Sequence, residues 1–432
     1  VVIGGLFTAT VLTLIVLPIL FKVFDSKEFK RSKLKKGKKH LTVILLLLAS
    51  SFGFAQNTNM SREAVIAKAL ENNKGIKAAA LQVNKMQENI KSSFTFEKTN
   101  VYYSYDQNNL ALNNLPLKVF GVQQRFLFPT VYGVQKKANT SEFEKEKADY
   151  ELQKNKLSLQ VAKTYEQIVY WQHQERLYSY LDSLYQNFSK ASDRRFELGE
   201  TNYLEKITAQ SKYRQIKTKL TQINFEKKAQ YESLQALVQS DEKISILEKE
   251  LVPIPTLDTT SNKAIHTAYL ESISKMYKSQ ISLQKQHWLP DLNLEYFQGR
   301  NNGLSQSLYG FQVGIAVPIL FSGNVSKTKV AQLESQSWEE QKQNQEQKMT
   351  QFIRQQQNEI AKYQESINYY NATGKKLSEE IIKVANSSYK NGEIDFFQYI
   401  QSLENAVAIK IEYVEAVLQF NSNQLELHYL NF

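Results

Sequence analysis

The chain has 432 residues and a formal net charge of +11, and only 15 of its residues are glycine and 7 proline. This length is enough for two or three domains, and so few turn-forming residues imply long elements between the turns. Because the sequence contains no cysteine, it excludes a disulfide framework, a thiolate zinc site and a catalytic thiol.

The first apolar run covers residues 1–21 and carries no charged side chain. At ~1.5 Å per residue a helix of this length spans about 30 Å, the thickness of a bilayer core. Nine Lys/Arg and two acidic residues follow between Lys22 and His40, so this short segment carries +7 of the net charge. We therefore expect a transmembrane helix at 1–22, a basic cytoplasmic segment at 23–40, and no nucleic-acid partner.

The second apolar run, residues 41–50, is too short to span a bilayer comfortably. A lysine-rich stretch precedes it, and the small residues Gly53 and Ala55 follow it. This pattern predicts an internal signal peptide at 41–55, cleaved between Ala55 and Gln56. The alternative is that the two apolar runs form one helical hairpin that anchors the chain.

The motif GGLFTATVLTLIVLP at 4–18 resembles the last transmembrane helix of heavy-metal efflux pumps of the resistance-nodulation-division (RND) superfamily. The resemblance implies that the chain opens with the tail of such a pump, whose C-terminus is cytoplasmic. A second protein with its own signal would then follow in the same frame. A first residue of Val1 in place of Met agrees with a fragment of a longer polypeptide.

From residue 61 onward the sequence is duplicated with a period of 193 residues. RRFELGETNYLEKITAQ at 194–210 corresponds to SSYKNGEIDFFQYIQSL at 387–403, and Leu127-Phe128 corresponds to Leu320-Phe321. We expect one repeat at 56–240, a linker at 241–261 and a second repeat at 262–432.

Each repeat predicts the same order of elements: a helix, a β-hairpin, a very long helix, a glycine turn and a returning helix. In the first repeat the expected helices are 61–93, 135–196 and 202–238, and the strands are 100–106 and 119–128. In the second repeat the helices are 262–287, 325–389 and 395–430, and the strands are 291–298 and 308–317.

The very long helices carry apolar stripes and need partners along their sides, as in a coiled coil. The four short, aromatic-rich strands suit a membrane-spanning sheet, but four strands cannot close a barrel, and lipid does not tolerate an open edge. The sequence therefore predicts a mainly α fold with a small β part. Three copies would share a 12-stranded transmembrane β-barrel above a trimeric α-barrel of long-helix hairpins.

This duplicated order is similar to that of the outer membrane factor (TolC-like) family of efflux channels, over nearly all of 61–432. The resemblance implies a homotrimer in outer-membrane lipid and periplasm, with a periplasmic adaptor (a membrane fusion protein) and an inner-membrane RND pump as partners. It implies that the adaptor docks at the two tip turns. The turn residues are Leu198, Gly199 and Glu200 in the first repeat and Asn391, Gly392 and Glu393 in the second.

The family also has a periplasmic constriction just after the second tip turn. The matching positions include Gln398 and Gln401, which replace the acidic residues of TolC, so this chain departs from an acidic cation-binding ring. Asp395 and, in the first repeat, Glu205 are the candidates for negative charge nearby.

No spacing of residues indicates an enzyme, a cofactor site or a metal site, since the five histidines are scattered and no nucleotide-binding or nucleophile motif occurs. The expected function is a passive exit duct for efflux, with heavy-metal cations as the cargo that the pump-like segment implies. The alternatives are a TolC-like channel for type I protein secretion or drug efflux, and a periplasmic coiled-coil adaptor without a barrel.

Overall fold

In the computed structural model the chain divides into two units, Val1–Gln56 and Asn57–Phe432. The structure describes residues 59–110, 116–301 and 306–430, all within the second unit. The expected transmembrane helix, basic segment and signal peptide lie outside the described residues, as does the expected cleavage point between Ala55 and Gln56. Within the described ranges, no helix is both long enough and apolar enough to cross a membrane.

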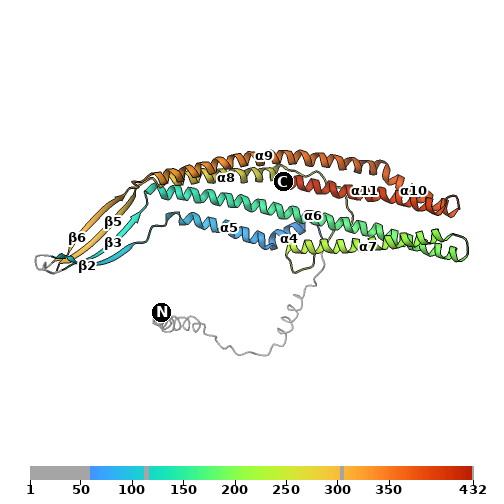
Figure 1. Cartoon of the computed structure of the whole chain (residues 1–432), viewed down its shortest axis with the longest axis horizontal. Coiled ribbons are helices and arrows are strands. Elements are labelled where there is room, and N and C mark those ends of the chain that lie inside the picture. Colours follow the sequence, from blue (N-terminus) through green and yellow to red (C-terminus); the bar gives the residue numbers. More distant parts are fainter. Residues whose placement is uncertain (1–58, 111–115, 302–305, 431–432) are drawn as a thin grey trace, which may run out of the picture. The chain divides into compact units, whose positions relative to one another are not determined.

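The first half of the described chain has the expected order of helix, hairpin, very long helix and returning helix (Figure 1). Its elements are β1 (Asn59–Met60), α4 (Arg62–Asn72), α5 (Lys74–Lys91), η2 (Ser92–Phe94), β2 (Asn100–Leu110), β3 (Pro116–Phe126), α6 (Pro129–Glu197) and α7 (Tyr203–Val238). At ~1.5 Å per residue the 69 residues of α6 make a helix of about 100 Å. Such a helix finds packing partners only along its sides.

The second half repeats this order after a linker that contains one short strand. Its elements are β4 (Ser245–Ile246), α8 (Thr260–Gln286), β5 (Asp291–Asn301), β6 (Leu308–Ala316), α9 (Ser322–Tyr369), the π-turn η3 (Tyr370–Gly374), α10 (Lys375–Lys390) and α11 (Phe396–Tyr429). β4 pairs in parallel with β1, which ties the linker to the start of the first half. The described chain is therefore mainly helical with a small β part, as the sequence predicts.

The four longer strands form an antiparallel sheet in the order β2-β3-β5-β6. The helices that enter and leave this sheet follow the same order, because α6 packs against α5 and α8, and α8 packs against α9. Figure 1 shows the sheet at one end of these helices and the α6–α7 and α10–α11 turns at the other end. Both β2 and β6 are edge strands of this sheet.

The largest apolar core surrounds the middle of α6. Val161, Tyr165 and Ile168 follow one another at helical spacing and are fully buried. They belong to a cluster that also contains Val65 of α4 and Val417 of α11. Fully burying a side chain of this size contributes roughly 1.5–3 kcal/mol, so this core holds both halves and the N-terminal helix together.

A buried polar node lies beside this core. Glu166 of α6 accepts hydrogen bonds from Arg62 Nη1 (3.0 Å) and from Asn421 Nδ2 (2.8 Å). Asn421 also accepts from the Ile254 amide (2.9 Å) and donates to the Val252 carbonyl (2.9 Å). Burial raises the pKa of Glu166, and the bonds from Asn421 and Arg62 oppose that shift. The node joins α4, α6, the linker and α11.

The prediction of one continuous helix at 61–93 is wrong at Asn73. Ser61 is the N-cap of α4, accepting from the Ala64 amide at 3.3 Å. Asn73, however, takes a non-helical conformation, and its side chain accepts from the amides of Gly75 and Ile76. This asparagine ends one helix and caps the next, so α4 and α5 are separate.

Other elements also differ from the predictions. The helix expected at 135–196 starts at Pro129, a residue well suited to a first helical position. The helix expected at 325–389 is interrupted by η3, whose last residue is Gly374. The strands β2 and β5 continue into stretches that composition marks as turns, because cross-strand pairing extends to Leu110 and Asn301.

Candidate functional site

The α6–α7 turn is built around Gly199, which has φ +75°. The Glu200 amide donates to the Arg195 carbonyl (2.8 Å) and the Gly199 amide to the Phe196 carbonyl (3.0 Å). This is the Schellman arrangement, in which a left-handed residue ends a helix and satisfies its last carbonyls. A Cβ at Gly199 would have no atom within 4 Å, so the backbone conformation, and not space, requires glycine here.

The α10–α11 turn repeats this geometry at Gly392, which also has φ +75°. The Glu393 amide donates to the Ser388 carbonyl (2.8 Å) and the Gly392 amide to the Tyr389 carbonyl (3.2 Å). The two turns lie at the same end of the helices (Figure 1). The duplicated sequence motif therefore corresponds to a duplicated tip.

The returning helices are capped by polar side chains that the motif supplies. Asn202 accepts from the Glu205 amide at 2.9 Å. Asp395 accepts from the Gln398 amide (2.8 Å), and the Gln398 side chain accepts from the Asp395 amide (3.1 Å). This reciprocal pair is a capping box. Asp395 and Gln398 thus have a structural role at the start of α11.

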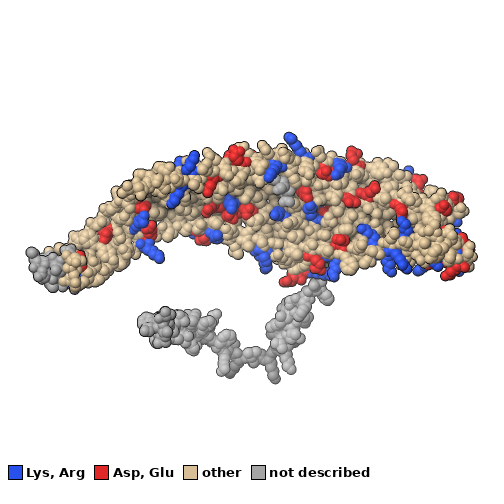
Figure 2. Space-filling model, in the orientation of Figure 1, with Lys and Arg blue, Asp and Glu red and all other residues tan. Residues whose placement is uncertain are grey.

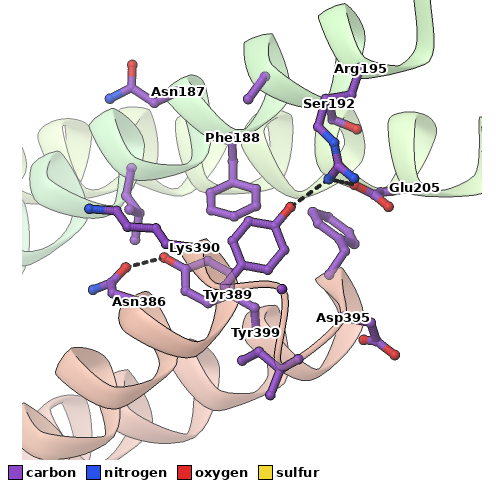
Figure 3. Close-up of a pocket in the computed structure, with 15 residues that line it drawn as sticks. Asn187, Phe188, Ser192, Arg195, Glu205, Asn386, Tyr389, Lys390, Asp395 and Tyr399 are labelled. Carbon is purple, nitrogen blue, oxygen red and sulfur yellow. Dashed lines mark hydrogen bonds and ion pairs between the residues drawn. The ribbon is translucent and has the colours of Figure 1, made fainter. Parts of the chain in front are cut away.

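Arg195 joins the two tips (Figure 3). Its Nη1 donates to Glu205 (3.2 Å) within the first tip and to the Tyr389 hydroxyl (3.1 Å) on the second. Glu205 also accepts from the Thr201 hydroxyl at 2.6 Å. Glu205 is therefore held between two donors of its own hairpin.

A stack of aromatic rings continues this contact away from the turns. Phe188 of α6 lies 5.4 Å from Tyr389 and 4.8 Å from Tyr399, measured between ring centroids. The Tyr399 hydroxyl donates to Asn386 Oδ1 at 2.6 Å. Burial raises the pKa of Tyr399 to about 12, so this hydroxyl stays protonated at neutral pH. The rings hold the α6–α7 and α10–α11 hairpins together near their tips.

A cavity of about 800 Å³ lies between these hairpins (Figure 3). Both tips contribute to its lining, with Arg195 and Glu205 from the first and Tyr389 and Asp395 from the second. Ser192 lines it too; its residue is 2% exposed and its hydroxyl has no hydrogen-bond partner among the described residues. The cavity therefore offers aromatic walls with both signs of charge at its edge.

Large apolar side chains are exposed around the tips. Leu198 is 65% exposed on the first turn, and Tyr203, Leu204 and, on the second tip, Phe397 are also exposed. Exposed apolar side chains grouped in this way are typical of a surface that meets another molecule.

The predicted site residues are only partly brought together. All six turn residues lie at the tips: Leu198, Gly199, Glu200, Asn391, Gly392 and Glu393. Of the constriction candidates, Glu205 and Asp395 line the common cavity, whereas Gln398 and Gln401 do not. Gln401 is exposed and donates to Asn405 at 3.0 Å. Within the described residues, no group of three or more His, Asp and Glu is arranged to hold a metal ion.

Sequence reasoning missed Arg195, Tyr389 and Tyr399 as the residues that connect the tips. Arg195 and Tyr389 lie inside or beside the quoted turn motifs, but their partners are about 190 residues away in the chain. The usable signal was the aromatic residue on each side of the second turn, which is unusual for a solvent-exposed helix end.

The sheet has two different faces, as alternation along its strands requires. One row of paired residues crosses all four strands with apolar side chains: Val101, Val122, Tyr296 and Phe311. The neighbouring row on the opposite face is polar: Asn100, Gln123, Glu295 and Gln312. The apolar side chains are uncovered in the single chain, and Phe311 is 73% exposed.

Charged side chains are distributed differently over the helices and the sheet. Figure 2 shows lysine, arginine and acidic side chains interspersed over the helices, with few of them at the sheet end. Two polar contacts link strands of the sheet: Tyr102 donates to Glu295, and Arg125 donates to Asp291. Both pairs lie on the face that bears the polar row. Lys118 and Arg300 lie directly opposite each other on the other face, in phase with the apolar row.

No protein-family model matches this chain, and a search of curated proteins also finds no match. Solved structures do match it. CusC, whose structures concern folding and transmembrane channel formation, has a TM-score of 0.71 and 15% identity over 86% of this chain and 92% of its own. The CmeC outer membrane channel of Campylobacter jejuni has a TM-score of 0.71 and 14% identity over 86% of each chain. The open-state MtrE outer membrane channel of Neisseria gonorrhoeae has a TM-score of 0.65 and 15% identity over 85% of this chain and 88% of its own.

These likenesses cover 85–86% of this chain. The chain therefore has the fold of bacterial outer membrane channels. Identities of 15% or less show a shared fold alone.

Proposed function

We propose that this protein is the outer-membrane exit duct of a tripartite efflux system and that it works as a homotrimer. The observation that carries the proposal is the four-stranded sheet, which has one apolar face, one polar face and two unpaired edges. An apolar face of aromatic and branched side chains suits contact with lipid, and the polar face suits a water-filled interior.

The open edges support assembly. In the hydrocarbon region every backbone donor and acceptor needs a partner, so a sheet crosses a membrane only as a closed barrel. Even the smallest outer-membrane barrels have about eight strands, and one chain supplies four. Three copies supply the 12 strands of the shared barrel, and the long helices of the same copies form an α-barrel beneath it.

The tips are the proposed docking surface for a periplasmic adaptor. Leu198, Tyr203 and Phe397 are exposed beside the glycine turns, and the cavity between the hairpins lies next to them. In the trimer the second tips would surround the axis, with Asp395, Gln398 and Gln401 near the constriction and Glu205 behind them.

The cargo belongs to the same proposal. The pump-like segment at 4–18 favours an inner-membrane RND pump for heavy-metal cations as the energy source of the duct. The duct performs no chemistry and only provides a path. Deleting the coding sequence for residues 56–432 should make the strain more sensitive to metal cations. Unchanged tolerance would overturn the proposed metal cargo but would leave the proposed duct intact.

The duct itself is tested on protein purified from the outer-membrane fraction. We expect light scattering in detergent to give the mass of three copies. In planar bilayers the protein should show discrete conductance steps. Mass spectrometry should place the mature N-terminus at Gln56. A monomer without conductance would overturn the proposal. An uncut chain in the inner membrane would favour the periplasmic adaptor without a barrel.

A further inference from the structure

Another cavity, of about 510 Å³, lies where α9 passes into α10 beside α11 (Figure 1). One stripe of its lining belongs to α9 and η3, and the other stripe belongs to α11. The lining residues are Glu365, Ser366, Tyr369 and Tyr370 on the first side and Ile409, Glu412 and Tyr413 on the second. None of them lines the cavity between the tips, so this is a separate candidate site.

The π-turn and its glycine set the position of the aromatic side chains. In η3 the Lys375 amide donates to the Tyr370 carbonyl, five residues back instead of the usual four. A Cβ on Gly374 would lie 3.2 Å from both Tyr369 Cε1 and Ile409 Cγ2. Glycine therefore lets the Tyr369 ring pack closely against the π-turn. π-turns inside α-helices frequently occur at functional sites.

The walls of this cavity are largely aromatic. The rings of Tyr370 and Tyr413 stack, with their centroids 3.9 Å and their planes 15° apart. Tyr369 lies beside them and is 52% exposed. The face of an aromatic ring attracts a cation that lies within about 6 Å of its centroid. The three rings therefore favour a positively charged ligand.

Both carboxylates of the cavity lack a cationic partner. Glu365 and Glu412 are exposed, and neither makes an ion pair or a hydrogen bond with another described residue. Lys362, one turn before Glu365 on α9, pairs with Glu359 instead. Among the described residues that line the cavity there is no lysine, arginine or histidine. The lining thus carries two negative charges and no positive one.

The first repeat lacks this chemistry at the matching positions. With the period of 193 residues that relates the repeats, Tyr369 corresponds to Arg176 and Glu412 to Lys219. α6 also continues through this level as one α-helix, without a π-turn. The packing that the two repeats share therefore does not require aromatic or acidic side chains here.

We propose that this cavity binds a small organic cation with alkyl groups on its nitrogen, of the quaternary ammonium class. The tyrosine rings attract the charge, the two carboxylates neutralise it, and Ile409 with the rings contacts the alkyl groups. A metal ion suits the cavity less, because the volume is far larger than one ion needs. Within the described chain, moreover, no group of three or more His, Asp and Glu is arranged to hold a metal. The site goes beyond the proposed duct and requires neither the trimer nor the metal cargo.

Isothermal titration calorimetry with choline tests the site on the purified protein. The protein is kept in an uncharged maltoside detergent, and sodium chloride balances the ionic strength between titrations. The matched ligand control is dimethylbutanol, the neutral isostere of choline in which carbon replaces the charged nitrogen. We expect choline to bind in the millimolar range and the isostere to bind about tenfold more weakly, because it lacks the charge that the rings and carboxylates attract.

Substitutions locate the binding in the cavity. Glu365→Gln combined with Glu412→Gln removes both charges at nearly constant shape and should weaken choline binding about tenfold. The control is Glu340→Gln, the same change at an exposed residue of α9 outside the cavity, which should leave binding unchanged. Tyr369→Leu removes an exposed ring and should weaken binding about threefold, whereas Tyr369→Phe should retain it.

Light scattering of each variant checks that its assembly is unchanged, and four outcomes then decide the inference. No binding of choline to the unaltered protein would overturn it. Equal binding of the isostere would overturn the cationic class of ligand. Full binding by the double glutamine variant, or an equal loss in Glu340→Gln, would overturn the location. Choline binding that depends on both carboxylates in a monomer without conductance would support this site and overturn only the duct.

Discussion

At the residue scale, the Asn421 side chain joins three separate groups. Its side chain is fully buried on α11, where it binds Glu166, the Val252 carbonyl and the Ile254 amide. These partners come from α6 and from the linker. An amide side chain offers two donors and one acceptor oxygen, so this single residue satisfies groups from two separate segments.

Replacing Asn421 by alanine should therefore remove the hydrogen bonds to the Ile254 amide, the Val252 carbonyl and one oxygen of Glu166. Each buried group left unpaired costs roughly 1–3 kcal/mol, so we expect the opening free energy of this region to fall by about 3 kcal/mol. Hydrogen exchange at the Ile254 amide measures that loss. Asn423→Ala, on the same helix and half-buried, is the control and should change it little; equal effects would contradict a specific role for the node.

The sequence could not have identified Asn421 or Glu166. Each stands among polar residues of a long helix, and neither matches a motif. The residues that they bind are distant in the chain. Ile254 and Asn421 are 167 residues apart, and Glu166 and Asn421 are 255 residues apart. Gly199 and Gly392, in contrast, were identified because a helix end with a left-handed residue is a local requirement.

At the element scale, the helices follow the sequence closely wherever their ends are set by local chemistry. The glycine turns were predicted for this reason, whereas Asp395 was predicted only as a source of negative charge and is also the cap of α11. The break at Asn73 and the π-turn before Lys375 were not, since Asn also occurs inside helices and the π-turn fits against α11. There a Cβ on Gly374 would lie 3.2 Å from Ile409 Cγ2, a tertiary contact.

At the tip turns, replacing glycine changes the free energy of the left-handed backbone conformation without introducing a steric clash. Gly392→Ala should destabilise the α10–α11 tip by about 1 kcal/mol, because alanine disfavours φ +75° while its Cβ meets nothing within 4 Å. Gly392→Asn should recover part of the loss, since asparagine tolerates this conformation. Hydrogen exchange of the tip amides is the measurement.

The control substitution uses a glycine in the opposite situation. Gly133 lies within α6, and a Cβ there also meets nothing within 4 Å. Gly133→Ala should stabilise α6 by up to about 1 kcal/mol, because alanine is the better helix former. If both alanine substitutions changed stability in the same direction, the left-handed turn would not be the reason for glycine at 392.

At the scale of the whole molecule, the sequence predicted the presence of a small sheet but not which face each residue takes. Alternation within one strand gives two faces, and only the cross-strand register aligns them over four strands. The observed register places Val101, Val122, Tyr296 and Phe311 in one row. The proposed membrane-spanning role rests on this alignment more than on the composition of any single strand.

Neighbouring residues on β6 test that role by charge. Val313 lies on the apolar face and Gln312 on the polar one. A lysine facing lipid near the middle of the bilayer costs roughly 2–4 kcal/mol, whereas a lysine facing a water-filled interior costs little. Val313→Lys should therefore lower the yield of folded, protease-resistant protein in lipid vesicles at least tenfold. Gln312→Lys should leave the yield unchanged and shift the ion selectivity of the channel toward anions. Equal losses in both variants would contradict a sheet with one lipid face and one water face.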